Sequence, residues 1–245
     1  MLLIDIGNTC FKWAVSSEDK FVQKGIKCYQ SAEITDLFDE VFSSVSVQKR
    51  IYISCVASEN IKQKIECWFK KNWQVNSVFV VSQASQAGLF NAYNDAEKLG
   101  VDRWCAMIGA WVKYKKAFCI IDCGTAVTLD VVDNEGHHLG GLIMPGLTMM
   151  QAALSQGTAG ISHGSGERLE LAKKTTDAVN SGCYQLLSSG LEMMLNKHRL
   201  MLGNDLLCIV TGGDGAELSK QFKCDYIFEP DVILYGLQQA AITGL

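Results

Sequence analysis

Two short acidic turns in this sequence carry residue types that suit the chemistry of phosphate and metal ions. Asp5 and Asp122 each close an apolar run, and a glycine follows each of them two residues later, at Gly7 and Gly124. Glycine lets the backbone turn sharply and approach a ligand closely, and the exposed N–H groups of such a turn can form a nest for an anion. An aspartate does not itself attract phosphate, so its expected partner is a hydrated Mg²⁺ or another cation that accompanies phosphate.

A second apolar run follows each turn and predicts a β-hairpin. This order differs from the glycine loop followed by a helix that binds phosphate in dinucleotide-binding and P-loop proteins. Thr9 and Thr125 add a hydroxyl donor to each turn. One copy alone is more readily an ordinary hairpin turn, in which Asp and Gly are common. Because the two copies each lead a part of the chain with the same strand order, we expect a nucleotide held between two duplicated lobes.

A different kind of acidic residue lies in the stretch KLGVDRW at residues 98–104. Asp102 precedes an apolar helical run, so one interpretation is a helix N-cap aspartate followed by a surface Arg103. The functional interpretation makes Asp102 a general base, which orients a substrate hydroxyl and accepts its proton during phosphoryl transfer. Arg103 would then hold an anionic substrate. Tyr93 either lines the same pocket or only packs.

Strand and helix patterns alternate along the chain and then restart, which predicts an α/β fold with largely buried sheets. The first half predicts strands at 2–5, 10–15, 21–29, 50–56 and 77–82, and helices at 31–45 and 59–71. The second half predicts strands at 117–122, 127–133, 137–143 and 206–211, and helices at 102–115, 146–155, 167–172, 175–198 and 231–243. We therefore expect two similar lobes, residues 1–101 and 102–245.

Composition limits the classes of partner and the cellular compartment. A formal net charge of −4 argues against broad binding of nucleic acid or an anionic membrane, since both need a basic face. The chain has no apolar stretch near the roughly 20 residues that span a membrane, and its start does not resemble a secretory signal. Ten scattered cysteines without a Cys-x-x-Cys pair predict reduced, mostly buried thiols and a cytoplasmic protein. The four histidines show no metal-ligand spacing, so no zinc site is expected.

Three stretches taken together resemble the signature motifs of the type III pantothenate kinase family: DIGNT at 5–9, GVDR at 100–103 and DCGTA at 122–126. Their order and spacing, and the chain length, agree with that family over nearly the whole sequence. The resemblance implies the fold of the actin, sugar-kinase and heat-shock ATPase superfamily, with two duplicated ribonuclease H-like lobes of mixed sheets flanked by helices. It also implies ATP-dependent phosphorylation of pantothenate at its primary hydroxyl, the first step of coenzyme A biosynthesis.

The same resemblance implies a role for individual residues. Asp102 is the expected general base, Thr125 is expected to contact ATP, and Asp122 is expected to bind a monovalent cation, K⁺ or NH₄⁺, which the family uses beside Mg²⁺. The first phosphate-binding hairpin comprises Asp5, Ile6, Gly7, Asn8, Thr9, Cys10, Phe11 and Lys12. The residues expected to contact pantothenate are Tyr93, Gly100, Val101, Asp102, Arg103 and Thr175.

The resemblance is less specific in the region from residue 159 to residue 178. Thr175 matches a family threonine that usually follows Asn, but here Lys174 precedes it and Thr176 is an alternative. Residues 159–162 (AGIS) lack the proline of a Leu-Pro pair that family members often carry near the partner subunit's pantothenate site. Members are typically homodimers, and apolar helices such as 146–155 would supply the surface.

Several features leave alternatives open. Lys12 is either a solvated strand residue or a contact of the phosphates, and the sequence favours neither. A role for His163 is also left open. The glycines of residues 211–215 (TGGDG) would let a base or ribose lie against the backbone, although such turns are common. The alternatives to a pantothenate kinase are a regulatory relative that assists transcription and another small-molecule kinase or phosphatase of the superfamily. Intact Asp5, Asp102 and Asp122 favour an enzyme over the first, and the short chain with Gly-x-Asp-Arg argues against the second.

Overall fold

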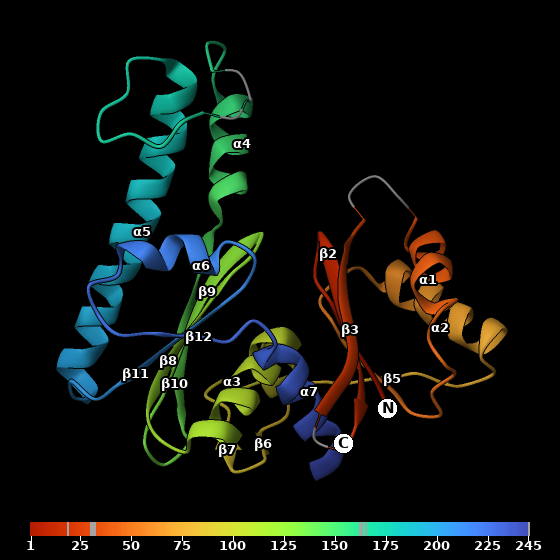
Figure 1. The fold of residues 1–245 in the computed structure, drawn as a ribbon. Coiled ribbons are helices and arrows are strands. Elements are labelled where there is room, and N and C mark those ends of the chain that lie inside the picture. The colour runs from red at the N-terminus through yellow and green to blue at the C-terminus, as the bar shows by residue number, and fades with distance from the viewer. Residues whose placement is uncertain (19, 30–32, 162–163, 165, 245) are drawn as a thin grey trace. The chain divides into compact units, whose positions relative to one another are not determined.

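The computed structural model describes residues 1–18, 20–29, 33–161, 164 and 166–244 (Figure 1). Contacts within the chain divide it into two compact units. The first unit comprises Met1–Lys115 together with Asp231–Leu245, and the second comprises Lys116–Pro230. No helix among the described residues is both long and apolar enough to cross a membrane.

A five-stranded mixed sheet forms the centre of the first unit. Its strands are β1 (Leu2–Ile6), β2 (Cys10–Ser17), β3 (Lys20–Cys28), β4 (Ile51–Cys55) and β5 (Val78–Phe79). Their order across the sheet is β3-β2-β1-β4-β5. The β1–β2 and β2–β3 pairs are antiparallel, whereas β1 pairs with β4, and β4 with β5, in parallel.

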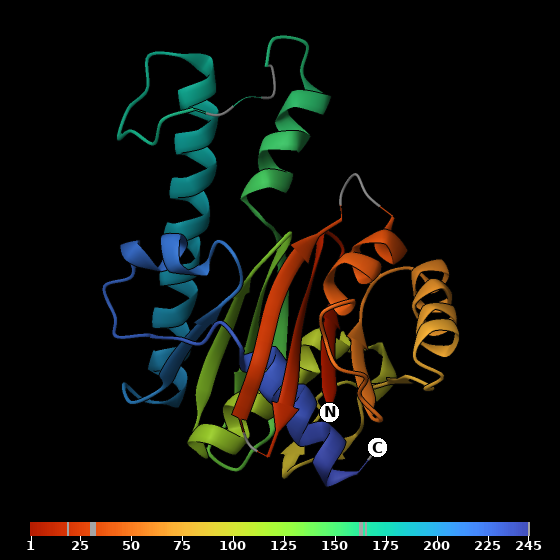
Figure 2. The same ribbon diagram turned by 45° about the vertical axis from the view of Figure 1, so that its right-hand side comes forward.

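Helices cover both faces of this sheet. Leu2, Ile4 and Ile6 share one face and pack in one core cluster with aromatic residues of α1 (Ile34–Phe42) and α2 (Glu59–Asn72). Figures 1 and 2 show these two helices together on one side of the β1–β3 strands. Because side chains alternate along a strand, Leu3 and Asp5 face the other side. There α7 (Val232–Thr243) lies against β1, β2 and β4, and α3 (Val101–Tyr114) lies against β4.

The second unit repeats this strand order. Its strands are β8 (Phe118–Cys123), β9 (Ala126–Val132), β10 (His138–Pro145), β11 (Leu207–Thr211) and β12 (Ile227–Phe228). They are arranged β10-β9-β8-β11-β12, with two antiparallel pairs followed by two parallel pairs. The duplication expected from the two acidic turns is therefore confirmed, including the hairpin after each turn.

Two long helices accompany the second sheet. Figures 1 and 2 show α4 (Leu147–Gly157) and α5 (Thr175–Leu202) projecting beyond the strands of this unit. The face that carries Cys119 and Ile121 of β8 packs against Leu187 and Leu191 of α5. The short elements that complete the chain are β6 (Ser85–Gln86), β7 (Leu89–Phe90), η1 (Ala96–Lys98), α6 (Gly215–Leu218) and η2 (Ser219–Gln221).

The compact units differ from the expected lobes in the helices that they contain. The predicted division after residue 101 assigned α3 and α7 to the second lobe. In the structure both helices belong to the first unit, where they pack against each other and against its sheet. The two helices approach closely because Gly109 and Gly236 meet at their contact: a Cβ on Gly236 would lie 1.7 Å from the carbonyl oxygen of Cys105.

One predicted helix is absent. Residues 167–172 are not helical, because α5 binds carbonyls that a helix would use for its own hydrogen bonds: Gln185 Nε2 donates to those of Leu169 and Glu170. The N–H of Glu167 donates to Asp177 Oδ1 at 2.9 Å, and the N–H of Leu169 donates to Ser181 Oγ at 2.9 Å. The helix expected at 31–45 is shorter, at Ile34–Phe42, and residues 31 and 32 lie outside the described part of the chain.

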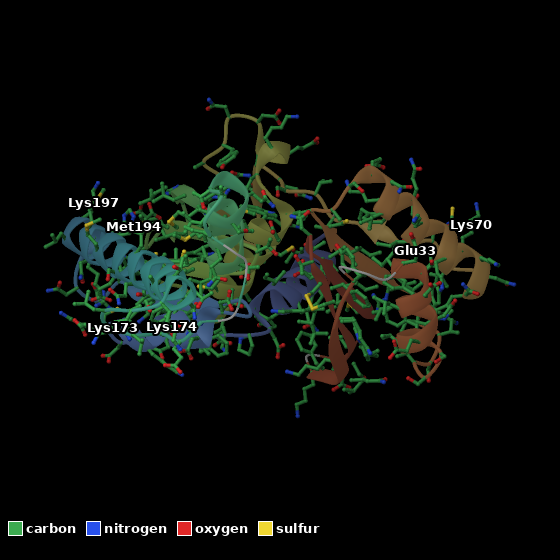
Figure 3. All side chains as sticks on the ribbon, turned by 90° about the horizontal axis from the view of Figure 1, so that it is seen from above. Glu33, Lys70, Lys173, Lys174, Met194 and Lys197 are labelled. Atoms are coloured by element: carbon green, nitrogen blue, oxygen red, sulfur yellow. A yellow bond between two sulfur atoms is a disulfide. The ribbon has the colours of Figure 1, made fainter. Side chains whose placement is uncertain are left out.

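The prediction of reduced cysteines is wrong for one pair. Cys10 and Cys28 form a disulfide (Figure 3), because the antiparallel register of β2 and β3 puts them directly opposite each other. The other eight cysteines are free, and six of these are buried, as expected. Spacing along the chain did not reveal the pair, since its partners meet only through the strand register.

Candidate active site

The first acidic turn is held in place by its own sheet. Asp5 is 8% exposed, lies opposite Lys12 of β2 and Ser54 of β4, and accepts a hydrogen bond from Ser54 Oγ at 2.8 Å. The N–H of Gly7 donates to the carbonyl of Cys10 at 3.0 Å and closes the hairpin. These contacts fix a carboxylate at the carboxyl end of the central strand.

A tyrosine after β3 supports the loop of this hairpin. The hydroxyl of Tyr29 donates to the carbonyl of Gly7, and its N–H donates to the carbonyl of Thr9 at 2.9 Å. Burial raises the pKa of this tyrosine, and the charges of Cys55 and Asp5 raise it further. Sequence patterns did not single out Tyr29 or Ser54, because neither lies in a motif and both act through strand neighbours.

The second acidic turn has the same construction in the second unit. The N–H of Gly124 donates to the carbonyl of Ala126 at 3.1 Å, and the carbonyl of Thr125 accepts from the N–H of Gly146 at 3.1 Å. Thr125 is exposed, whereas Asp122 is half-buried. Asp122 lies opposite Thr128 of β9 and Thr211 of β11 in the sheet register.

The structure joins the glycine turn of residues 211–215 to this second acidic turn. Gly212 has a φ of +90°, and a Cβ there would lie 2.5 Å from Asp122 Oδ1 and 2.4 Å from the carbonyl oxygen of Cys123. The N–H of Asp214 donates to the same carbonyl at 3.0 Å. Burial raises the pKa of Asp214, and the charge of Arg168 opposes that shift. Thr211 Oγ1 is buried and has no hydrogen-bond partner among the described residues.

Asp102 lies in the first turn of α3, where Gly100 is the N-cap residue. The interpretation of Asp102 as an N-cap is therefore wrong. Its Oδ1 accepts a hydrogen bond from the N–H of Arg103 at 2.7 Å. Burial raises the pKa of the neighbouring Cys105 thiol well above its usual value, and the negative charges of Asp5 and Asp102 both add to the shift. The two carboxylates thus act on one buried thiol within the first unit.

Arg103 and Tyr93 lie together beside Asp102. Arg103 is 5% exposed, so it is not a surface arginine. Its Nη1 donates to the hydroxyl of Tyr93 at 3.1 Å, and its guanidinium carbon lies 5.8 Å from the centre of the Tyr93 ring. The structure therefore brings these two predicted substrate contacts together, although ten residues separate them.

Thr175 and its alternative Thr176 belong to the second unit. Thr175 is exposed and begins α5, directly after the N-cap Lys174, which Figure 3 labels; Thr176 is half-buried. Ser162 and His163 lie outside the described residues.

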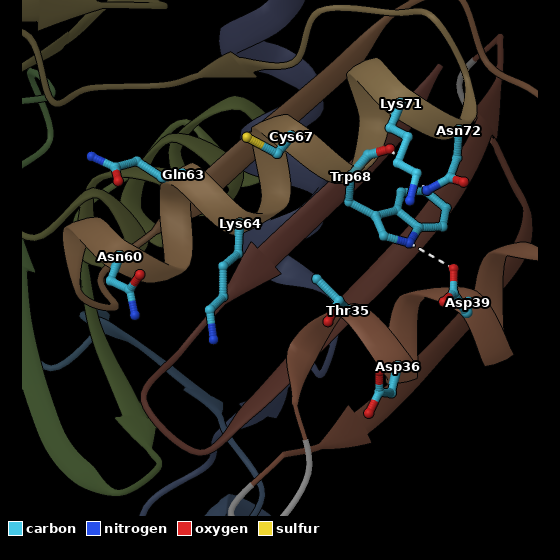
Figure 4. A pocket seen from close by; sticks show the side chains of 10 residues that line it. All are labelled: Thr35, Asp36, Asp39, Asn60, Gln63, Lys64, Cys67, Trp68, Lys71 and Asn72. Carbon is cyan, nitrogen blue, oxygen red and sulfur yellow. Dashed lines mark hydrogen bonds between the residues drawn. The ribbon is translucent and has the colours of Figure 1, made fainter.

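Two other polar features lie apart from the predicted residues. A cavity of about 550 Å³ opens between α1 and α2, next to the hydrogen bond from Trp68 Nε1 to Asp39 (Figure 4). None of the predicted site residues lines it. In the β9–β10 turn, ligand atoms of Asp133, Glu135 and His137 lie within 4.8 Å of one another, although the sequence showed no metal-ligand spacing around the histidines.

Two sheets of identical strand order, each with an aspartate–glycine turn after its central strand, define the actin-like ATPase fold. A crystal structure of a conserved putative Baf family transcriptional activator from Campylobacter jejuni matches with a TM-score of 0.61 and 22% identity, over 97% of this chain and 96% of that chain. The structure of MreB 5 of Spiroplasma citri bound to AMPPNP matches with a TM-score of 0.52 and 11% identity, over 97% of this chain and 94% of that one. These likenesses show the fold alone.

Sequence comparison identifies the family within this class. The pattern of the type III pantothenate kinase family matches residues 1–197, and the chain belongs to that family. The type III pantothenate kinase of Nitrosococcus oceani is 32% identical over 249 residues, which cover 98% of this chain and 93% of that protein. The protein is accordingly an enzyme that uses ATP to phosphorylate pantothenate in coenzyme A biosynthesis.

Proposed function

We propose that Asp102 is the general base of this reaction and accepts the proton of the primary hydroxyl of pantothenate as that oxygen attacks the γ-phosphate of ATP. The observation that carries the proposal is the position of Asp102 in the first turn of α3, beside the buried Arg103–Tyr93 pair. A carboxylate in this role only has to orient the hydroxyl and take its proton, while other groups stabilise the charge on the phosphoryl oxygens.

Pantothenate carries a carboxylate, and Arg103 is the cation proposed to bind it. The planar guanidinium of an arginine that is held in place by a tyrosine suits the recognition of a carboxylate. Gly100 and Val101 supply backbone next to the base, and Thr175 is proposed as a further contact. Thr176 is the alternative to Thr175, because the structure gives both positions at the start of α5.

The first hairpin is proposed to bind the phosphates of ATP through the residues from Asp5 to Lys12. Oxygen ligands suit Mg²⁺, and the carboxylate of Asp5 with the hydroxyls of Ser54 and Thr9 is a donor set of that kind. When bound, Mg²⁺ neutralises charge that develops on the transferred phosphoryl group. The chain's own contribution is to hold the Asp5 carboxylate at a fixed place through the Ser54 hydrogen bond.

Asp122 is proposed to bind the monovalent cation, K⁺ or NH₄⁺, and the exposed Thr125 is proposed to contact the nucleotide. The hydroxyl of Thr211, in register with Asp122, finds no hydrogen-bond partner in the described part of the chain. With the carbonyl of Cys123 next to Gly212, it fits an oxygen-rich cation site. The proposal therefore separates the two acidic turns: Asp5 serves the phosphates and their metal, and Asp122 serves the monovalent cation.

The assembly is proposed to be a homodimer, for which exposed apolar residues of α4 such as Met149 and Leu154 offer a surface. A cytoplasmic location is proposed from the eight free cysteines. The negative net charge supports small-molecule substrates and no binding of nucleic acid or membrane.

An assay of ATP consumption with and without pantothenate tests this assignment. With K⁺ as the only monovalent cation, pantothenate-dependent turnover should be about tenfold faster than with Na⁺, a typical size for coupling between two sites. Asp122→Asn should remove the difference between the two salts. Equal rates in the parent protein would contradict the role of Asp122, and no turnover in either salt would contradict the catalytic proposal as a whole.

Tyr93→Phe tests the proposed support of Arg103. The variant removes a hydrogen bond worth about 0.5–1.5 kcal/mol, so the KM for pantothenate should rise about three- to tenfold while kcat changes little. Steady-state kinetics with pantothenate as the varied substrate measure both constants. Tyr226→Phe, a change at a partly exposed tyrosine in the second unit, is the matched control and should leave them unchanged. An unchanged KM in Tyr93→Phe would count against the assignment.

A further inference from the structure

Residues 166–170, which we call the strap, lie along the first half of α5 and are fixed to it by hydrogen bonds. The N–H of Glu167 donates to Asp177 Oδ1 at 2.9 Å. The N–H of Leu169 donates to Ser181 Oγ, also at 2.9 Å. Both acceptors are buried side chains of α5. The backbone on either side of residue 168 is therefore held in a defined position.

Arg168 connects the strap to two further elements. Its guanidinium carbon lies 4.4 Å from the centre of the ring of Tyr184, a residue of α5 that is 7% exposed. Its Nη1 donates to Glu217 Oε1 of α6 at 2.8 Å. The hydroxyl of Tyr184 donates to the backbone carbonyl of the same Glu217 at 3.1 Å. Because a guanidinium stacked on an aromatic ring keeps its plane, Arg168 and Tyr184 together hold both the side chain and the backbone of Glu217.

Backbone hydrogen bonds link α6 to the second acidic turn. The N–H groups of Glu217 and Leu218 donate to the carbonyl of Asp214 at 3.2 Å and 2.9 Å. The N–H of Asp214 donates to the carbonyl of Cys123 at 3.0 Å, and Cys123 directly follows Asp122. α6 also lies against β8, the strand that ends at Cys123. The contacts of Arg168 with α6 are therefore only a few hydrogen bonds away from Asp122.

The turn at residues 211–215 packs against Asp122 without room for adjustment. A Cβ on Gly212 would lie 2.5 Å from Asp122 Oδ1 and 2.4 Å from the carbonyl oxygen of Cys123. Closely packed backbone passes a shift on to its neighbours, because protein interiors are hardly compressible. A movement of α6 would therefore displace the oxygen atoms around Asp122, and a contact that holds α6 also holds those oxygen atoms in place.

We propose that Arg168 is a positioning residue for the phosphorylation of pantothenate, which acts through Glu217 and α6 on the oxygen atoms around Asp122. The proposal rests on the monovalent cation site proposed at Asp122, and it adds the residue that keeps this site in its binding geometry. Neither Arg168 nor Glu217 has to touch a substrate or the cation for this role. With the ion pair intact the site is preorganised, so the cation does not have to rearrange α6 when it binds.

A titration of activity with K⁺ tests the proposal. In Arg168→Gln the K⁺ concentration that gives half-maximal pantothenate-dependent turnover should rise about three- to tenfold, the range that one exposed ion pair and one cation–π contact supply. The kcat at saturating K⁺ should change by less than about twofold, because the bound cation restores the arrangement. A loss of folded protein would lower kcat instead. Arg168→Lys keeps the charge but not the planar guanidinium, so its titration should lie between those of the parent and Arg168→Gln.

Changes at Glu217 and Lys220 separate the position of α6 from the charge of Glu217. Lys220 also pairs with Glu217, and its hydrogen bond lowers the pKa of this carboxyl more than the charge of Arg168 does. Lys220 follows α6 directly in the chain, so it does not tie α6 to the strap. Lys220→Gln is the matched control and should leave the K⁺ titration unchanged. Glu217→Ala should shift the titration as Arg168→Gln does, and the double variant should show no further shift.

Amide hydrogen exchange of the ligand-free protein measures the hold on α6 independently of activity. Arg168→Gln should exchange faster than the parent in the peptide that covers residues 212–218, whereas Lys220→Gln should match the parent. If K⁺ activates the parent but Arg168→Gln changes neither the titration nor this exchange rate, the proposal is overturned. An equal shift in Lys220→Gln also overturns it. A parent that K⁺ does not activate would instead contradict the role of Asp122, and the exchange rates would then decide whether Arg168 holds the turn.

Discussion

Replacing Asp102 by asparagine is expected to lower kcat for pantothenate phosphorylation by about 10²- to 10⁴-fold, the range found when a general base is removed. Asparagine keeps the size of the side chain and an oxygen that can accept the N–H of Arg103, as Oδ1 of Asp102 does at 2.7 Å. It cannot take up the proton of the substrate hydroxyl. The fold and the binding of ATP should therefore survive while the chemical step is lost.

The measurement combines single-turnover kinetics with a thermal unfolding curve and an ATP binding titration. Asp36→Asn is the matched control, since Asp36 is an exposed acid in the first turn of another helix, α1. Both substitutions remove a negative charge near a helix N-terminus, which is worth about 0.3–1 kcal/mol of stability. A variant Asp102→Asn with near-normal turnover would exclude this residue as the base.

Replacing Gly236 by alanine is expected to destabilise the first unit by about 3 kcal/mol or more. The added Cβ would lie 1.7 Å from the carbonyl oxygen of Cys105 and 2.8 Å from the N of Gly109. Both are backbone atoms of α3, so no side-chain rotation relieves the clash and the two helices must move apart. Overpacking that moves backbone costs about 1–3 kcal/mol and occasionally more, and this contact is at the severe end.

Thermal unfolding followed by circular dichroism measures the effect. For a chain of this size a loss of about 3 kcal/mol lowers Tm by about 6–12 °C. Gly190→Ala is the control: Gly190 is also helical, but a Cβ there meets nothing within 4 Å. Alanine forms helix better than glycine by about 1 kcal/mol, so this variant should keep or raise Tm. A Tm of Gly236→Ala within about 1 °C of the parent would contradict the conclusion that the packing of α3 against α7 requires a glycine at this position.

The position of these helices matters for the proposed site because α3 carries Asp102 and Arg103. Sequence patterns predicted α3 and α7 as helices, but assigned them to the second lobe because both follow residue 101. Their packing depends on two glycines, Gly109 and Gly236, that are far apart in the chain. Neither glycine belongs to a motif, so only the fold shows that the C-terminal helix returns to the first sheet.

The same distinction applies to the candidate site. The motifs identified Asp5, Asp102 and Asp122, because each lies in a short contiguous stretch whose residue types indicate its chemistry. Their surroundings come from residues outside the motifs: Ser54 of β4 donates to Asp5, Tyr29 holds the loop after Asp5, and the N–H of Asp214 binds the carbonyl of Cys123 next to Asp122. Likewise the Cys10–Cys28 disulfide follows from strand neighbours and not from spacing.

The sequence by itself determined the α/β class, most of the strands and helices, the duplication and the family, because periodicity and contiguous motifs are local properties of the chain. Tertiary structure alone decided the order β3-β2-β1-β4-β5, the membership of α3 and α7, and the pairing of Arg103 with Tyr93. It also decided that residues 167–172 are not helical, because α5 supplies partners for their backbone. Each of these features depends on contacts between residues that are far apart in the chain. The free energy of such contacts cannot be deduced from a local sequence pattern.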